Sequence, residues 1–153
     1  VFMYNNNIYY LYKNKNKYDK DKYILSTLKQ YNFTPKILYS NDNSLILLVE
    51  NVGVILNKLD VQLLNKFDFK NEINYINSKL KKHKIIHNDL NAHNLTLKNN
   101  KLYLIDFEYG ILNNDTDTRT KTVNTVYCKN FPLFNNDNTF VDYLKNNSCF
   151  DYK

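Results

Sequence analysis

Residues 85–97 read IIHNDLNAHNLTL, and the interpretation of the whole chain starts from this stretch. Apolar residues at both ends enclose a polar segment in which His87, Asp89 and Asn94 lie within eight positions. Apolar runs of this kind are usually buried, so the polar side chains between them must form internal hydrogen bonds or take part in chemistry. The spacing is not that of a metal site built from histidines and cysteines.

The segments on either side of this polar loop predict a helix before it and a hairpin after it. In residues 71–84 apolar side chains recur at helical spacing, with lysines on the other face. Residues 95–107, LTLKNNKLYLIDF, alternate around the turn formers Asn99-Asn100 and indicate two antiparallel strands. The hairpin returns a second acid, Asp106, to the neighbourhood of the loop.

The first third of the chain predicts a small sheet with one helix. Residues 8–13 favour a strand that ends on a lysine, residues 19–30 carry a helical period, and residues 36–50 indicate a hairpin. Asn51-Val52-Gly53 then breaks the pattern, and residues 54–67 show a loose helical period. The order predicts an α+β fold in one domain, with an N-terminal antiparallel sheet and a mainly helical second part.

Composition narrows the class of protein. The formal net charge is +6, but Arg119 is the lone arginine among scattered lysines, which favours a solvated lysine surface over a nucleic-acid partner. Cys128 and Cys149 have neither metal-site nor disulfide-framework spacing and suggest free thiols. The apolar runs are too short to cross a bilayer and no leader opens the sequence, so we expect a cytoplasmic protein.

The two acids and the amide suggest phosphoryl transfer. Asn94 and Asp106 offer hard oxygen atoms, and Mg²⁺ prefers a few protein oxygens together with phosphate and water. Asp89 is then free to accept a proton from an attacking hydroxyl. The interpretation without chemistry, in which these side chains only cap backbone groups of an Asn-rich loop, remains open for each residue taken singly.

His87-x-Asp89-x-x-x-x-Asn94 followed by Asp106-Phe107 resembles the catalytic loop and metal-binding motif of the protein-kinase-like superfamily. HNDL together with IDFEY, residues 105–109, is similar to the choline/ethanolamine kinase and aminoglycoside phosphotransferase branch. The resemblance covers about residues 8–113. It implies a protein-kinase-like fold that uses ATP and Mg²⁺, in which His87 braces the loop.

The same resemblance implies further site residues. Lys13 matches the lysine that holds the nucleotide phosphates, and Asp21 matches its acidic partner on the helix. Glu50 to Val52 match the hinge whose backbone binds adenine. The expected organisation is therefore a reduced N-lobe at 1–50, a hinge at 51–53 and a reduced C-lobe at 54–153.

Several features depart from that pattern. Gly53 and Gly110 are the only glycines, so the Gly-rich phosphate loop is missing, and we expect a minimal or N-terminally truncated member. Asn88 replaces an arginine that pairs with a regulatory phosphate in many protein kinases, while Asn91 and His93 occupy positions of phosphate-binding Lys or Arg. Residues 114–153 contain a threonine-rich stretch at 116–125 and predict a short helix at 140–144, and we expect them to form a reduced acceptor region.

The sequence therefore predicts an ATP- and Mg²⁺-dependent phosphotransferase acting on a hydroxyl, with a small alcohol such as choline, ethanolamine or an aminoglycoside as the favoured acceptor. One alternative is an enzyme of the protein Ser/Thr kinase type. A second is a pseudokinase that binds a nucleotide or a protein without efficient catalysis.

Overall fold

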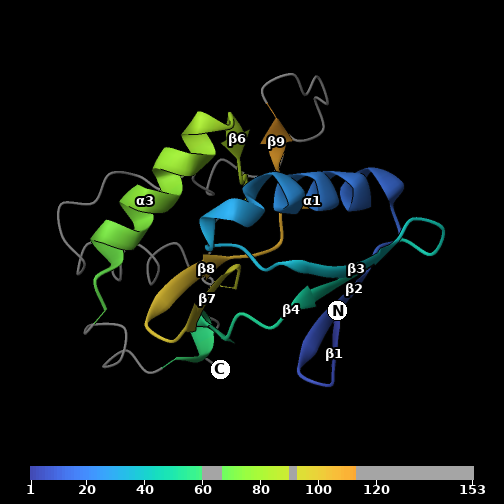
Figure 1. The fold of residues 1–153 in the computed structure, drawn as a ribbon, viewed down its shortest axis with the longest axis horizontal. Coiled ribbons are helices and arrows are strands. Elements are labelled where there is room, and N and C mark those ends of the chain that lie inside the picture. Colours follow the sequence, from blue (N-terminus) through green and yellow to red (C-terminus); the bar gives the residue numbers. More distant parts are fainter. Residues whose placement is uncertain (60–66, 90–92, 113–153) are drawn as a thin grey trace.

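The computed structural model describes residues 1–59, 67–89 and 93–112. Their elements follow the order strand, strand, helix, hairpin, short strand, helix and four further strands (Figure 1). They are β1 Phe2–Tyr4, β2 Asn7–Leu11, α1 Lys15–Leu28, η1 Lys29–Tyr31, β3 Ile37–Asn41, β4 Ile46–Glu50, β5 Val54–Ile55, η2 Leu56–Lys58, α3 Phe69–Lys82, β6 Ile85–Ile86, β7 Leu95–Lys98, β8 Lys101–Leu104 and β9 Ile111–Leu112. The architecture is the predicted α+β class.

The first sheet is antiparallel, with the strand order β1-β2-β4-β3. Helix α1 lies along one face of this sheet and contacts β3 and β4 (Figure 1). The predicted strand at 8–13 and the hairpin at 36–50 are confirmed as β2, β3 and β4. The alternation of aromatic and branched residues in these segments is sufficient to indicate strands.

Helix α1 begins four residues before the predicted start at residue 19. Asn14 caps it, because its Oδ1 accepts hydrogen bonds from the backbone N–H of Asn16 at 2.8 Å and of Lys17 at 3.2 Å. The first turn is almost entirely polar and therefore carries no hydrophobic period. Lys17 consequently lies on the helix, one turn before Asp21, so that the two side chains share a face.

The second part contains helix α3 and short strands. Helix α3 begins after Asp68, whose carboxylate accepts from the Asn71 N–H at 3.2 Å, and it matches the predicted helix at 71–84. The predicted hairpin is confirmed as β7 and β8, with positive φ angles at both residues of the Asn99-Asn100 turn. The helix predicted from the period at 54–67 is wrong at the start of that range, because Val54–Ile55 forms strand β5 and pairs with β7. Residues 60–66 lie outside the described part of the chain.

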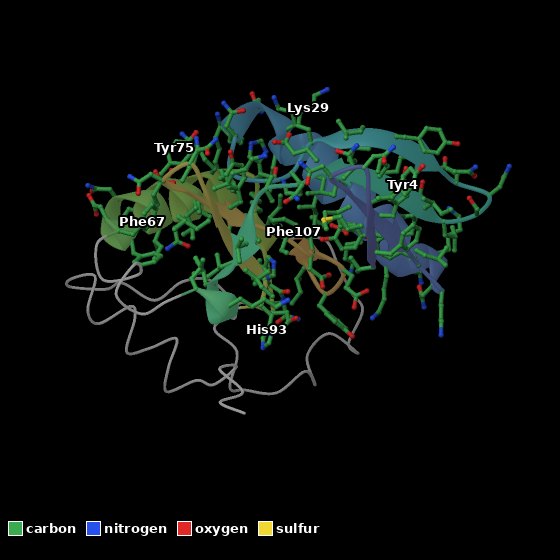
Figure 2. All side chains as sticks on the ribbon, turned by 90° about the horizontal axis from the view of Figure 1, so that it is seen from below. Tyr4, Lys29, Phe67, Tyr75, His93 and Phe107 are labelled. Atoms are coloured by element: carbon green, nitrogen blue, oxygen red, sulfur yellow. The ribbon has the colours of Figure 1, made fainter. Side chains whose placement is uncertain are left out.

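A continuous buried cluster connects the two parts. It includes the inward faces of α1, β4, α3 and the β7–β8 hairpin, together with Phe107, which is fully buried near the centre of Figure 2. The backbone also joins them, because the Leu104 N–H donates to the Phe33 carbonyl at 2.8 Å. The loop at 87–94 begins directly after β6 and ends at β7, so the strands and the core fix both of its ends.

The segment between β4 and β5 packs tightly on β7 at Gly53. This glycine has φ +104°, and a Cβ there would lie 2.2 Å from the Leu97 carbonyl oxygen. Val52 and Thr96 reinforce the contact, since the threonine hydroxyl donates to the Val52 carbonyl at 2.8 Å. Only glycine fits this conformation and this spacing.

We expect Gly53→Ala to lower the free energy of unfolding by about 1–3 kcal/mol, because it adds a backbone clash to a φ that L residues rarely adopt. Urea unfolding measures the loss. Gly110→Ala is the comparison: its Cβ would meet the Ile24 Cδ1 at 2.7 Å and the Phe107 carbonyl oxygen at 3.0 Å, but its φ is not in the left-handed region, so we expect a smaller loss. Equal losses in the two variants would show that the approach of Gly53 to β7 is not a special constraint.

Candidate active site

The polar loop is braced by His87, which is completely buried. Its Nδ1 accepts a hydrogen bond from the Asp89 backbone N–H at 3.3 Å, so Nε2 carries the ring proton and donates to the Ile105 carbonyl at 2.9 Å. Burial lowers the pKa of His87 to about 4, which keeps the ring neutral. The neutral ring also packs edge-on against Phe107, with 4.7 Å between ring centroids.

Asp89 and Asn94 are held together at the two ends of the loop. The Asn94 Nδ2 donates to both the backbone carbonyl and the Oδ2 of Asp89, each at 2.8 Å. The backbone of Asn94 is fixed in turn, because its carbonyl accepts from the Ile105 N–H at 2.9 Å. With its nitrogen committed to Asp89, the amide presents Oδ1 as the atom that can accept a ligand.

Asp106 follows β8 in a left-handed conformation, with φ +63°. Burial, first, and the negative charges of Glu108 and Asp89 raise its pKa to about 6, while Lys17 acts in the opposite direction. The Ile105 N–H donates to the Asn94 carbonyl at 2.9 Å, so the segment that carries Asp106 lies against the loop of Asp89 and Asn94. The structure therefore brings Asp89, Asn94 and Asp106 into one neighbourhood, and their roles in catalysis and metal binding stay predictions.

This group of residues fits a magnesium ion better than a transition metal. Within 1–59, 67–89 and 93–112 there is no cluster of three or more His, Cys, Asp or Glu side chains that could hold a metal. Asn94 and Asp106 instead provide one amide oxygen and one carboxylate. Mg²⁺ takes only one or two protein oxygens of this kind and completes its shell with phosphates and water.

The structure does not bring Lys13 and Asp21 together. Asp21 is buried, accepts a hydrogen bond from the Tyr12 hydroxyl and accepts another from the Phe107 N–H at 3.3 Å. Lys13 is exposed and lies two residues beyond the end of β2. Side chains two residues apart share a face of a strand, and Tyr10 and Tyr12 take the inward positions that a phosphate-binding lysine at 13 would need.

An apolar cavity of about 340 Å³ adjoins the residues predicted as a hinge. Ile8, Val49 and Val52 are among its lining residues, and Glu50 lies at the end of β4 beside it. The Asn51 and Val52 carbonyls are already occupied, since they accept from Lys98 at 2.5 Å and Thr96 at 2.8 Å. Among the described residues no acceptor is found for the Val52 N–H, and Val52 lines this cavity.

The chain runs from a sheet and helix through a connecting segment to a braced polar loop and an Asp-Phe pair. This order agrees with the comparison of the sequence with known families. The model of the RIO domain matches residues 3–118, more than half of the chain. This chain belongs to the RIO domain family. No curated protein matches it significantly.

RIO domains are atypical members of the protein-kinase-like superfamily, so the broad resemblance seen in the sequence is confirmed. The narrower similarity to choline/ethanolamine kinases and aminoglycoside phosphotransferases is not supported by this match. The narrower similarity was inferred from HNDL and the IDFEY motif, which do not identify a branch of the superfamily in this chain. No helix among the described residues is long and apolar enough to span a membrane.

Lys17 was missed in the sequence. It lies on α1, and its Nζ is 2.9 Å from Glu108 Oε1 and 4.0 Å from the centre of the Tyr109 ring. A helix start at Asn14 would have placed it one turn before Asp21, and Asn14 is a strong capping residue type. The predictions for Asn91, the region 114–153, Arg119 and both cysteines concern residues outside the described part of the chain.

Proposed function

We propose that this RIO domain binds ATP with Mg²⁺ and transfers the γ-phosphoryl group to a hydroxyl on a protein side chain. The observation that carries the proposal is the Asp89–Asn94 pair, held beside Asp106 by a neutral, buried His87. A loop whose only role was structural would not need to hold one carboxylate through an amide with a second, largely buried carboxylate close by. Family membership supports the kinase chemistry and the protein acceptor.

The chain's own residues divide the work. The apolar cavity beside Val52 would enclose adenine, and the free Val52 N–H would donate to one of its ring nitrogens. Asn94 Oδ1 and the Asp106 carboxylate would hold Mg²⁺, which when bound neutralises charge on the transferred phosphate. Asp89 would orient the acceptor hydroxyl and take its proton, with its carboxylate positioned by the Asn94 amide.

A small alcohol remains the competing acceptor. Assays with radiolabelled ATP separate the two, using a mixed protein substrate on one side and choline, ethanolamine and an aminoglycoside on the other. Labelled protein without labelled alcohol supports the proposal. Transfer only to a small alcohol would contradict the protein acceptor while leaving the phosphotransferase chemistry intact.

A nucleotide-binding module without efficient catalysis is the second candidate function, and one observation favours it. The buried carboxylate of Asp21 is occupied by Tyr12 and the Phe107 N–H, where the sequence predicted an ion pair with a phosphate-binding lysine. A module of this kind would bind ATP and transfer nothing. Measuring binding and transfer separately therefore distinguishes the two functions.

Magnesium-dependent binding tests the site directly. We expect ATP with Mg²⁺ at about one hundred times its dissociation constant to stabilise the fold by about 2.7 kcal/mol, which a thermal-shift titration detects. Asp106→Asn keeps the size of the side chain but removes the charge that would hold the cation. It should therefore reduce the magnesium-dependent part of the shift and leave the shift with adenosine unchanged.

Asp68→Asn serves as the control, since Asp68 caps α3 and lies outside the proposed site. Its shift with ATP and Mg²⁺ should equal that of the wild type. An identical shift for Asp106→Asn would remove Asp106 from the metal site. No shift for the wild-type chain at millimolar ATP would overturn the proposed function itself.

A further inference from the structure

A second cavity, of about 390 Å³, lies beyond the one beside Val52 and shares Tyr10 with it. Its lining residues include Asn14 and Lys17 of the α1 start, and Asp106 and Glu108 from the segment after β8. If adenine occupies the apolar cavity, the phosphates extend toward Asp106 and hence into this second cavity. The cation that meets them there must come from its lining.

Lys17 is the lining cation whose position the structure fixes. Its Nζ forms an ion pair with Glu108 at 2.9 Å and lies 4.0 Å from the centre of the Tyr109 ring. The lysine side chain is only 34% exposed and that of Glu108 24%. An ammonium group held by an acid and an aromatic face loses little further freedom when an anion binds.

The charges around the cavity require such a group. Its lining carries two carboxylates, those of Asp106 and Glu108, and two ammonium groups, those of Lys13 and Lys17. Without Lys17 these two carboxylates would face only the ammonium group of Lys13, and an entering polyphosphate would meet net negative charge.

Lys13 also lines the cavity but lacks this support. Its side chain is exposed, and among the described residues it makes no ion pair, hydrogen bond or ring contact. A free lysine loses side-chain entropy when it orders on a ligand, and its charge is screened by water. Lys13 is therefore the weaker of the two phosphate ligands.

We propose that Lys17, positioned on α1 by Glu108 and Tyr109, is the phosphate-binding lysine of this chain. This inference rests on the proposed nucleotide binding. It places the phosphate-binding lysine on helix α1, whereas the sequence predicted Lys13, just after β2, for that role. The ion pair expected between strand and helix is replaced by one between α1 and the segment after Asp106. Glu108 acts through Lys17 as a positioning residue.

Isothermal titration with ADP and with adenosine tests the assignment, because only ADP reports on phosphate contacts. We expect Lys17→Met to weaken ADP binding about tenfold or more, as the loss of a charge-assisted contact implies, and to leave adenosine binding within about twofold. Lys13→Met should weaken ADP binding less than Lys17→Met does. Lys15→Met is the control, because Lys15 lies on the same helix turn, is exposed and forms an ion pair with Asp19.

Lys17→Arg keeps the charge and should restore much of the ADP affinity, and it decides the question if the methionine variant fails to fold. A loss of ADP affinity in Lys13→Met but not in Lys17→Met would overturn the assignment, as would unchanged affinity in both. Those outcomes leave the proposed function standing, because the wild type would still bind nucleotide. Only a wild type that binds neither ADP nor ATP contradicts both.

Discussion

Asp89→Asn is expected to lower the rate of phosphoryl transfer by about a thousandfold while the affinity for ATP with Mg²⁺ stays within about twofold. The substitution preserves the shape of the side chain, and an amide oxygen can still accept the hydrogen bond that Asn94 Nδ2 donates at 2.8 Å. What disappears is the ability to take a proton from the acceptor hydroxyl. Single-turnover transfer and titration calorimetry measure the two quantities separately.

Asp19→Asn is the matched control for this prediction, since Asp19 is an exposed carboxylate on α1 whose partner is Lys15. It should change neither quantity. Full transfer activity in Asp89→Asn would show that this carboxylate is not the base. Loss of ATP affinity together with activity would instead assign Asp89 to the binding of nucleotide or metal.

The polar loop could be predicted because its constraints are local. His87, Asp89 and Asn94 follow one another within a single loop, and the strands at its ends are visible as apolar runs. A hairpin with an Asn-Asn turn then has only one way to return Asp106 to that loop. Short-range geometry and turn chemistry were sufficient here.

The lysine that we propose as the phosphate ligand could not be chosen in this way, because several lysines lie close together between residues 13 and 22. Two local signals in the sequence nevertheless favour Lys17 over Lys13. Strand alternation places Tyr10 and Tyr12 inward and Lys13 out of phase, and an N-cap at Asn14 places Lys17 on the face of Asp21. The hydrophobic period, which begins later in the helix, concealed both.

Two-residue strands were beyond the reach of the sequence. The β6–β9 ladder pairs Ile85 with Leu112 and Ile86 with Ile111, and β5 pairs with β7 across a long separation. Segments this short have no period of their own, so their pairing follows from the packing of the whole fold. These ladders nonetheless matter for function, because β6 and β7 hold the two ends of the polar loop.

The buried carboxyl of Asp21 should make the stability of the fold depend on pH. Burial, with added repulsion from Asp106 and Glu108, raises its pKa to about 7, although the hydrogen bonds from Tyr12 and the Phe107 N–H oppose this effect. The folded chain therefore holds the proton more tightly than the unfolded chain, in which the pKa is about 3.9. Stability from this group is complete below about pH 4 and is lost as the pH rises to about 7.

Asp21→Asn removes that loss. The amide oxygen can accept from the Phe107 N–H and the amide nitrogen can donate to the Tyr12 hydroxyl oxygen, as a neutral acid would. We expect the variant to match the wild type near pH 4 and to exceed it near pH 8 by up to about 4 kcal/mol in free energy of unfolding. Urea unfolding at a series of pH values measures the difference.

The opposite contribution of His87 cancels in this comparison, because both proteins retain it. Its pKa is lowered to about 4, so it adds stability as the pH rises from about 4 to about 6.5.

Asp21→Leu is the control: it cannot bond Tyr12 or the Phe107 N–H, and it should be less stable than Asp21→Asn at every pH. If the free energies of unfolding of Asp21→Asn and the wild type differed by a constant amount from pH 4 to 8, Asp21 would not titrate in this range. The hydrogen bond from the Phe107 N–H to Asp21 would then link α1 to the Asp106-Phe107 segment without a pH-dependent charge.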